Sequence, residues 1–220
     1  MLAIKRARLV AGAENKLIKL KEIMQDFQKE SHMLVYCGAT TISDVDYIEG
    51  IPNQEELRQI SAVGRILGND LDMKVAQFTS EENSEEREML KKEFSKGENL
   101  QVLIAIRCLD EGVNIPNIKK AFILASSTNP KEYIQRRGRV LRLSDNKNFA
   151  NIYDFVTLPR QLKHVKGLTS DQVKNDKSLL KKEIKRIKDF ADLSENPQKS
   201  YKIINKIKEN YDLEGGLYEY

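Results

Sequence analysis

The stretch "LQVLIAI", residues 100–106, is the most apolar short run in the chain. It is shorter than an ordinary helix and rich in β-branched side chains, so it predicts a strand that is buried on both faces. Strands of this kind belong to parallel sheets whose two faces are covered by helices. The neighbouring sequence should therefore alternate strands with helices.

Such an alternation extends on both sides of this run. Further short apolar runs predict strands at 32–37, 73–79, 120–126 and 150–156. Apolar residues at helical spacing predict helices at 14–30, 53–69, 85–97 and 130–142. Strands that alternate with helices pair in parallel through right-handed crossovers. We predict an α/β fold with an open, mainly parallel sheet and helices on both faces.

The pattern changes beyond Pro159, where no further strand is predicted. Two Lys-rich amphipathic helices follow, separated by Asn196 and Pro197. Their lysines are either a surface for duplex phosphate or a solvated face. The predicted organisation is a first helix with its flanks (1–31), a sheet domain (32–160) and a helical extension (161–220).

Composition limits the class of protein. The chain has 220 residues, of which 40% are hydrophobic, and no apolar run reaches membrane-spanning length. The N-terminus lacks the pattern of a secretory signal, and two cysteines are too few for a disulfide framework, so we expect a cytoplasmic protein without a membrane partner. A net charge of +4 does not by itself establish nucleic-acid binding.

The basic residues concentrate in two places, and the first is the predicted helix at 130–142. At about 100° per residue, Gln135, Arg139 and Arg142 fall within roughly 60° of one another. The opposite side should be buried and carries Tyr133, Ile134, Val140 and Leu141. Gly138 lies beside the polar side and leaves room for a ligand to approach.

Two interpretations of this polar side stay open on the residues alone. Arginine presents a rigid fork of donors that suits phosphate oxygens, so the pair can stabilise charge on a transferring phosphoryl group. Alternatively, the arginines form a solvated basic face with ion pairs to neighbouring acids.

Four motifs in one order resemble a known family. They are "MLVYCGAT" (33–40), "FTSEENSEEREMLKKEFSKGE" (78–98), "VLIAIRCLDEGVNIP" (102–116) and "QRRGRVLR" (135–142). Together they resemble the C-terminal, second RecA-like motor domain of superfamily 2 helicases of the DEAD/DEAH type. The wording is closest to the branch with DNA-repair helicases and restriction-enzyme translocases. The resemblance covers about residues 32–160.

The resemblance implies roles around a nucleotide. Arg139 and Arg142 would be arginine fingers that reach the γ-phosphate of ATP, and Gln135 would help to sense it. Gly112 would let the backbone approach the nucleotide. Asn114, at a position that is usually Asp, would touch the ribose through uncharged hydrogen bonds.

Nucleic acid would meet the loops that follow the strands, because ligands of open α/β sheets bind at the carboxyl ends of the strands. Backbone amides and hydroxyls there hold phosphates without reading bases, although each loop is equally explained by ordinary turn chemistry. The candidates are Gly38, Thr40, Thr79, Ser80, Ser127 and Asn129. The family's Thr-Asp pair is here Ile106 and Arg107; Arg107 either contacts phosphate or pairs with Asp110 or Glu111.

The chain contains no phosphate-binding loop of the form G-x-x-x-x-G-K-[ST] and no acidic magnesium-binding box after a strand. We therefore expect ATP and Mg²⁺ to be held mainly by an N-terminal motor domain outside this chain, and no metal ligand here. The helix at 14–30 resembles the connector to such a domain. The expected partner is DNA, with RNA not excluded; the alternative is a non-catalytic nucleic-acid-binding or protein-interaction module that keeps the motor fold.

Overall fold

The computed structural model divides the chain into two compact units, Met1–Phe155 (unit 1) and Val156–Tyr220 (unit 2). The residues that it describes are 14–37, 54–79, 81–106, 115, 117–124, 134, 137–138, 140–142 and 147–213. Within these ranges no helix is long and apolar enough to cross a membrane.

A five-stranded parallel sheet forms the centre of unit 1, in the order β2-β3-β1-β4-β5. The central strand β1 pairs with β3 and β4, so that Val35 lies opposite Ile104 and Phe122. The strands are β1 (Met33–Cys37), β2 (Val75–Phe78), β3 (Val102–Ile106), β4 (Lys120–Ile123) and β5 (Asn151–Asp154). Each lies within a predicted run, and the predicted fold class is confirmed.

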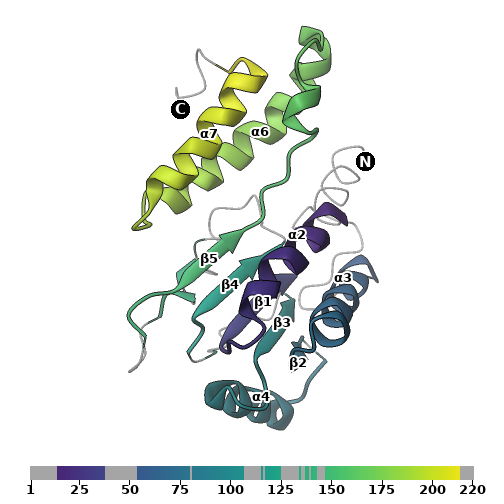
Figure 1. The fold of residues 1–220 in the computed structure, drawn as a ribbon, viewed down its shortest axis with the longest axis vertical. Helices are drawn as coiled ribbons and strands as arrows, with labels where there is room; N and C mark the ends of the chain where they lie inside the picture. The colour runs from purple at the N-terminus through teal and green to yellow at the C-terminus, as the bar shows by residue number, and fades with distance from the viewer. Residues whose placement is uncertain are drawn as a thin grey trace. The chain divides into compact units, whose positions relative to one another are not determined.

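One face of the sheet is covered by α2 (Glu14–Met24) and α3 (Gln54–Arg65), as Figure 1 shows. A 3₁₀ turn η1 (Gln25–Phe27) extends α2, and a π-helical turn η2 (Ile66–Asp70) extends α3. Leu20 and Met24 of α2 are fully buried. They belong to the core on this face of the sheet, together with side chains of β1 and β3. The apolar stripe of the first helix is therefore occupied by the sheet of unit 1.

The opposite face of the sheet is covered by α4 (Ser84–Lys96). Asn83 caps the first turn of α4 in a capping box with Glu86. Phe94 of α4 is fully buried against the sheet. The helix ends at Gly97, whose φ of +72° places it in the left-handed region. A side chain there would also meet the ring of His32, because an added Cβ would lie 2.7 Å from His32 Cε1.

Replacing Gly97 by alanine should therefore lower the free energy of unfolding by about 1–3 kcal/mol, from the left-handed backbone and the displaced imidazole. Gly138→Ala is the matched control, because a Cβ at Gly138 meets nothing within 4 Å. The control should be neutral or stabilising by up to about 1 kcal/mol. Urea unfolding of both variants measures the difference, and equal midpoints would contradict the account of the helix end.

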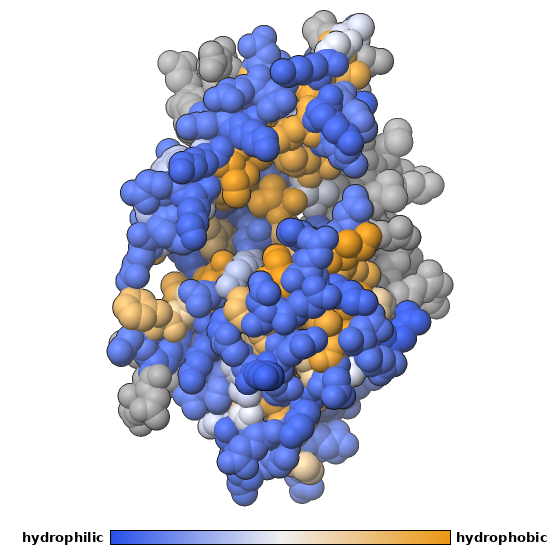
Figure 2. All heavy atoms as spheres, viewed as in Figure 1, coloured by the Kyte–Doolittle hydropathy of each residue, from blue (hydrophilic) through white to orange (hydrophobic). Residues whose placement is uncertain are grey.

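Unit 2 contains a short 3₁₀ turn and two packed helices. They are η3 (Leu162–His164), α6 (Ser170–Ala191) and α7 (Pro197–Tyr211). Pro197 opens α7 at a position where its missing N–H costs no helical bond. The two helices share a core that includes Leu180, Ile184, Ile204 and Ile207, whereas the surface over them is predominantly hydrophilic in Figure 2.

Candidate nucleotide and nucleic-acid site

The predicted site residues follow strands that all end at one edge of the sheet. Because β1, β2, β3 and β4 are parallel, their last residues, Cys37, Phe78, Ile106 and Ile123, lie at the same edge. Most of the predicted site residues lie outside the described residues, and their roles stay predictions: Gly38, Thr40, Ser80, Arg107, Gly112, Asn114, Ser127, Asn129, Gln135 and Arg139. Cys37 is fully buried and burial raises its pKa, so it is a packing residue.

The described part of the arginine motif is helical and packs on the sheet through a single side chain. The Leu141 amide donates to the Arg137 carbonyl at 2.9 Å, which is a helical turn. Val140 is 2% exposed and belongs to the core under α4, together with residues of β1. The side chain of Arg142 is exposed, and space is open around Gly138.

The predicted buried face of this helix is correct for Val140 and wrong for two other residues. Ile134 is 46% exposed and Leu141 is 43% exposed. On a helix both lie about 100–120° from Val140, so the helix contacts the sheet over a narrower face than predicted. Tyr133, the fourth member of the predicted face, lies outside the described residues.

Lys147 binds backbone carbonyls at the end of the helix that carries the arginine motif (135–142). Its ammonium is buried and donates to the carbonyl of Val140 and, at 3.0 Å, to the carbonyl of Arg142. Burial lowers the pKa of Lys147, whereas carbonyls at a helix C-terminus stabilise a cation. The backbone that carries Arg142 is therefore fixed by a residue that the sequence analysis did not single out.

Thr79 is the one predicted nucleic-acid contact whose surroundings are described. It is 2% exposed, and its amide donates to Oε2 of Glu82 at 2.5 Å. Its hydroxyl lies 3.0 and 3.2 Å from the two oxygens of the same carboxylate and accepts from the Glu81 amide at 3.1 Å. The amide and the hydroxyl of Thr79 therefore both bind a carboxylate of the chain itself.

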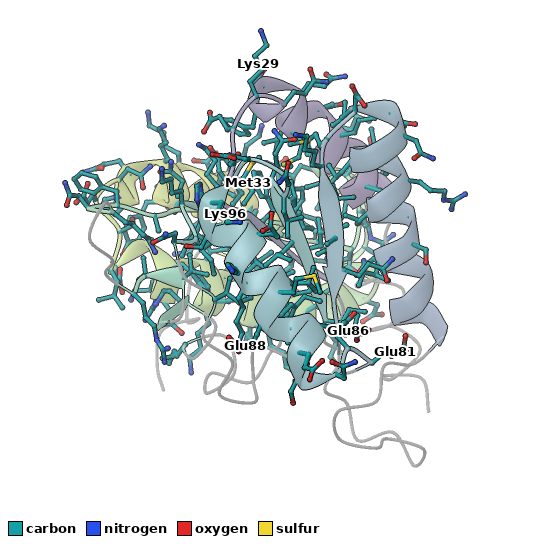
Figure 3. All side chains as sticks on the ribbon, turned by 90° about the horizontal axis from the view of Figure 1, so that it is seen from below. Lys29, Met33, Glu81, Glu86, Glu88 and Lys96 are labelled. Carbon is teal, nitrogen blue, oxygen red and sulfur yellow. The ribbon has the colours of Figure 1, made fainter. Side chains whose placement is uncertain are left out.

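Arg87 supports this turn from the first part of α4. Its Nη2 donates to the Thr79 carbonyl at 3.0 Å, and its guanidinium carbon lies 5.9 Å from the centre of the Phe78 ring. Its Nε is buried without a hydrogen-bond partner among the described residues. Figure 3 shows Glu81 and Glu86 at this end of α4 and Lys96 at the other.

Glu82 was missed by the sequence analysis, although a signal for it is present. In the spacing Thr79-x-x-Glu82, a carboxylate three residues after a threonine can accept a hydrogen bond from the threonine amide. No comparable local pattern marks Lys147, whose contacts depend on how the chain returns after the arginine helix. In the part of the chain that the structure describes, no cluster of His, Cys, Asp or Glu could hold a metal ion.

The parallel sheet and its two helical layers define a RecA-like α/β domain. The family "Helicase conserved C-terminal domain" matches residues 15–144, which is more than half of the chain. The chain therefore belongs to the helicase conserved C-terminal domain family.

Individual relatives agree with the family. The chain is 39% identical over 82 residues to "Putative helicase 22" of Sulfolobus islandicus filamentous virus, covering 37% of the chain and 15% of that protein. It is 24% identical over 139 residues to "DNA 3'-5' translocase XPB2" of Sulfurisphaera tokodaii, covering 63% of the chain and 26% of that protein. The matches thus span about a quarter or less of these relatives.

Among solved structures, T4 UvsW has a similar fold. The comparison has a TM-score of 0.55 at 18% identity and covers 86% of this chain and 34% of UvsW. At this identity the similarity shows the fold alone.

Proposed function

We propose that the chain is the C-terminal motor half of an ATP-dependent DNA helicase or translocase. The observation that carries the proposal is the family match over residues 15–144, which contains strands β1 to β4 of the parallel sheet and all four quoted motifs. The similarity to a protein named as a DNA 3'-5' translocase supports DNA as the substrate. The wording of the four motifs supports the repair or restriction branch.

In this mechanism Arg139 and Arg142 act across a cleft between two motor domains. When the halves close around ATP, the two guanidiniums stabilise the charge that develops on the γ-phosphate, with Gln135 beside them. Gly112 and Asn114 adjoin the nucleotide. Lys147 supports this role for Arg142, because it holds the carbonyl of Arg142 at the end of the helix. Reopening after hydrolysis steps the motor along the DNA backbone.

The ATP itself is held mainly by an N-terminal motor domain, because this chain has no glycine-lysine loop for the triphosphate. Mg²⁺, when bound there, neutralises charge on the β- and γ-phosphates. This chain alone then hydrolyses no ATP, and it completes the site of its partner domain.

The DNA backbone contacts the loops at the carboxyl ends of the strands, and Thr79, which is 2% exposed, becomes available to it only when the Glu82 carboxylate is displaced. Its amide and hydroxyl already hold the carboxylate of Glu82, so the same groups can hold two oxygens of a phosphate once Glu82 moves away. Glu82 thereby competes with DNA for Thr79.

Glu82→Gln should therefore raise the affinity for DNA by about three- to tenfold, since a neutral amide competes less well than a carboxylate for these donors. Glu81→Gln is the matched control, because it removes the same charge from the preceding residue, whose side chain is exposed. Fluorescence anisotropy with a labelled duplex measures both variants. An equal gain in both would assign the effect to net charge and refute the competition.

Translocation tests the proposed function directly. The full-length protein that contains this chain should displace a streptavidin block from the end of a biotinylated DNA when ATP is added. A module that only binds DNA leaves the block in place, and that result would refute the motor function.

A further inference from the structure

Helix α6 carries a straight row of lysines that the proposed motor mechanism does not use. At about 100° per residue, Lys174, Lys177, Lys181 and Lys185 fall within about 80° of one another, and at 1.5 Å per residue the row spans about 16 Å. Lys174, Lys181 and Lys185 are exposed and Lys177 is half-buried. We call these four residues the lysine row.

Two buried acidic residues of α6 pair with arginines rather than with this row. Asp176 and Glu183 are buried and form ion pairs with Arg160 and Arg186. None of the lysines in the row forms an ion pair or hydrogen bond with another described residue. The four lysines therefore have no ion-pair partner among the described residues, and Asp171 and Asp189 flank the row on α6.

The distribution of charge along the chain strengthens this conclusion. Residues 1–155 contain 23 basic and 23 acidic side chains, so their net charge is zero. Residues 156–220 contain 14 basic and 10 acidic side chains, which accounts for the whole net charge of +4. Positive charge concentrated in one unit is the electrostatic footprint of a polyanion-binding surface.

We propose that the lysine row binds the phosphate backbone of duplex DNA, as a second contact surface outside the sheet. B-DNA carries about one negative charge per 1.7 Å of its axis, so about ten phosphates lie along the length of the row. Lysines are flexible point charges that neutralise phosphates without reading bases. The choice of DNA over RNA rests on the proposed function. The inference that the row contacts phosphate rests on the lysines alone.

Two features of α6 favour a duplex over other polyanions. Single-stranded sites combine charge with aromatic side chains that stack on bases, whereas the only aromatic residue of α6, Phe190, lies on a different face from the row. Amphipathic helices that bind anionic membranes insert an apolar face. The apolar face of α6, with Leu180, Ile184 and Ile187, is already buried in the core that it shares with α7.

The test compares two triple variants of the 220-residue chain with equal net charge. Lys174→Gln, Lys181→Gln and Lys185→Gln together remove three charges from the row. Lys19→Gln, Lys29→Gln and Lys92→Gln together remove three charges from exposed positions of unit 1. Glutamine keeps good helix propensity, and circular dichroism checks that both variants fold.

Binding to a fluorescent 20-base-pair duplex is measured by anisotropy between 50 and 200 mM salt. The row variant should bind at least about tenfold more weakly at the lower salt, and the slope of log K against log salt should fall by about 2–3. The control variant should change affinity by less than about twofold. The assay uses no ATP. A negative result would therefore refute DNA binding by the lysine row without bearing on the motor function.

Three results would overturn the proposal. An equal loss in both variants would mean that only net charge matters. No loss in the row variant would make the row a solvated face. The row variant could also lose binding to phosphatidylserine vesicles or to polyglutamate as strongly as it loses binding to DNA. That result would mean that the row is a general polyanion surface.

Discussion

Arg139→Ala should lower DNA-stimulated ATP turnover of the full-length protein by about 10³-fold, while the variant still folds. An arginine that reaches the γ-phosphate stabilises charge that develops only in the transition state, and such fingers contribute roughly 10³–10⁵ in rate. Affinity for ATP should change much less, because we propose that the N-terminal motor domain holds most of the triphosphate. Steady-state turnover with saturating DNA, together with nucleotide binding by fluorescence, separates the two effects.

The control for this prediction lies in the same helix. Arg137→Ala removes an identical charge two residues away, which on a helix is a different face from Arg139. Turnover of the Arg137 variant should stay within a fewfold of the parent protein. Similar losses in both variants would mean that the helix contributes general positive charge, and unchanged turnover in the Arg139 variant would exclude a finger at this position.

The second large effect concerns the core of unit 2. Glu183 and Arg186 form a bidentate pair with distances of 3.2 and 2.9 Å, and their side chains are 6% and 5% exposed. Arg186→Met should lower the free energy of unfolding by about 3–5 kcal/mol, because it removes both hydrogen bonds of this pair from a buried carboxylate. Urea unfolding followed by circular dichroism measures the loss.

Removing both charges together should recover most of that stability. Glu183→Leu combined with Arg186→Met replaces the pair by apolar side chains, which in buried sites is often neutral or stabilising. Lys182→Met, at an exposed position of α6, controls for the loss of one charge. A single Arg186→Met variant that costs less than about 1 kcal/mol would show that the Glu183–Arg186 pair does not stabilise unit 2.

The strands of unit 1 could be predicted from sequence because each one is a short apolar run bounded by polar residues. Val102–Ile106 is buried at every position, as expected for a central parallel strand. The order β2-β3-β1-β4-β5 could not be predicted from local patterns, since pairing joins residues far apart in the chain. The π-helical turn at Ile66–Asp70 was also not predicted, because it continues the helical pattern of α3 without a break.

The candidate site was predicted as a set of motifs rather than as geometry. Sequence placed Thr79 in a loop at the sheet edge, but burial and the Glu82 carboxylate depend on how the turn folds between β2 and α4. Helical phase predicted the buried Val140. It also predicted Ile134 and Leu141 as buried, because phase alone does not show how narrow the contact between this helix and the sheet is.

The central claim is that this chain completes an ATPase site whose other half lies in an N-terminal motor domain. ATP turnover should be measured for the chain alone, for the N-terminal domain alone and for the two together, each with and without duplex DNA. DNA-stimulated turnover is expected only when both are present. Turnover by the isolated chain equal to that of the combination, or no gain when the chain is added to the N-terminal domain, would contradict it.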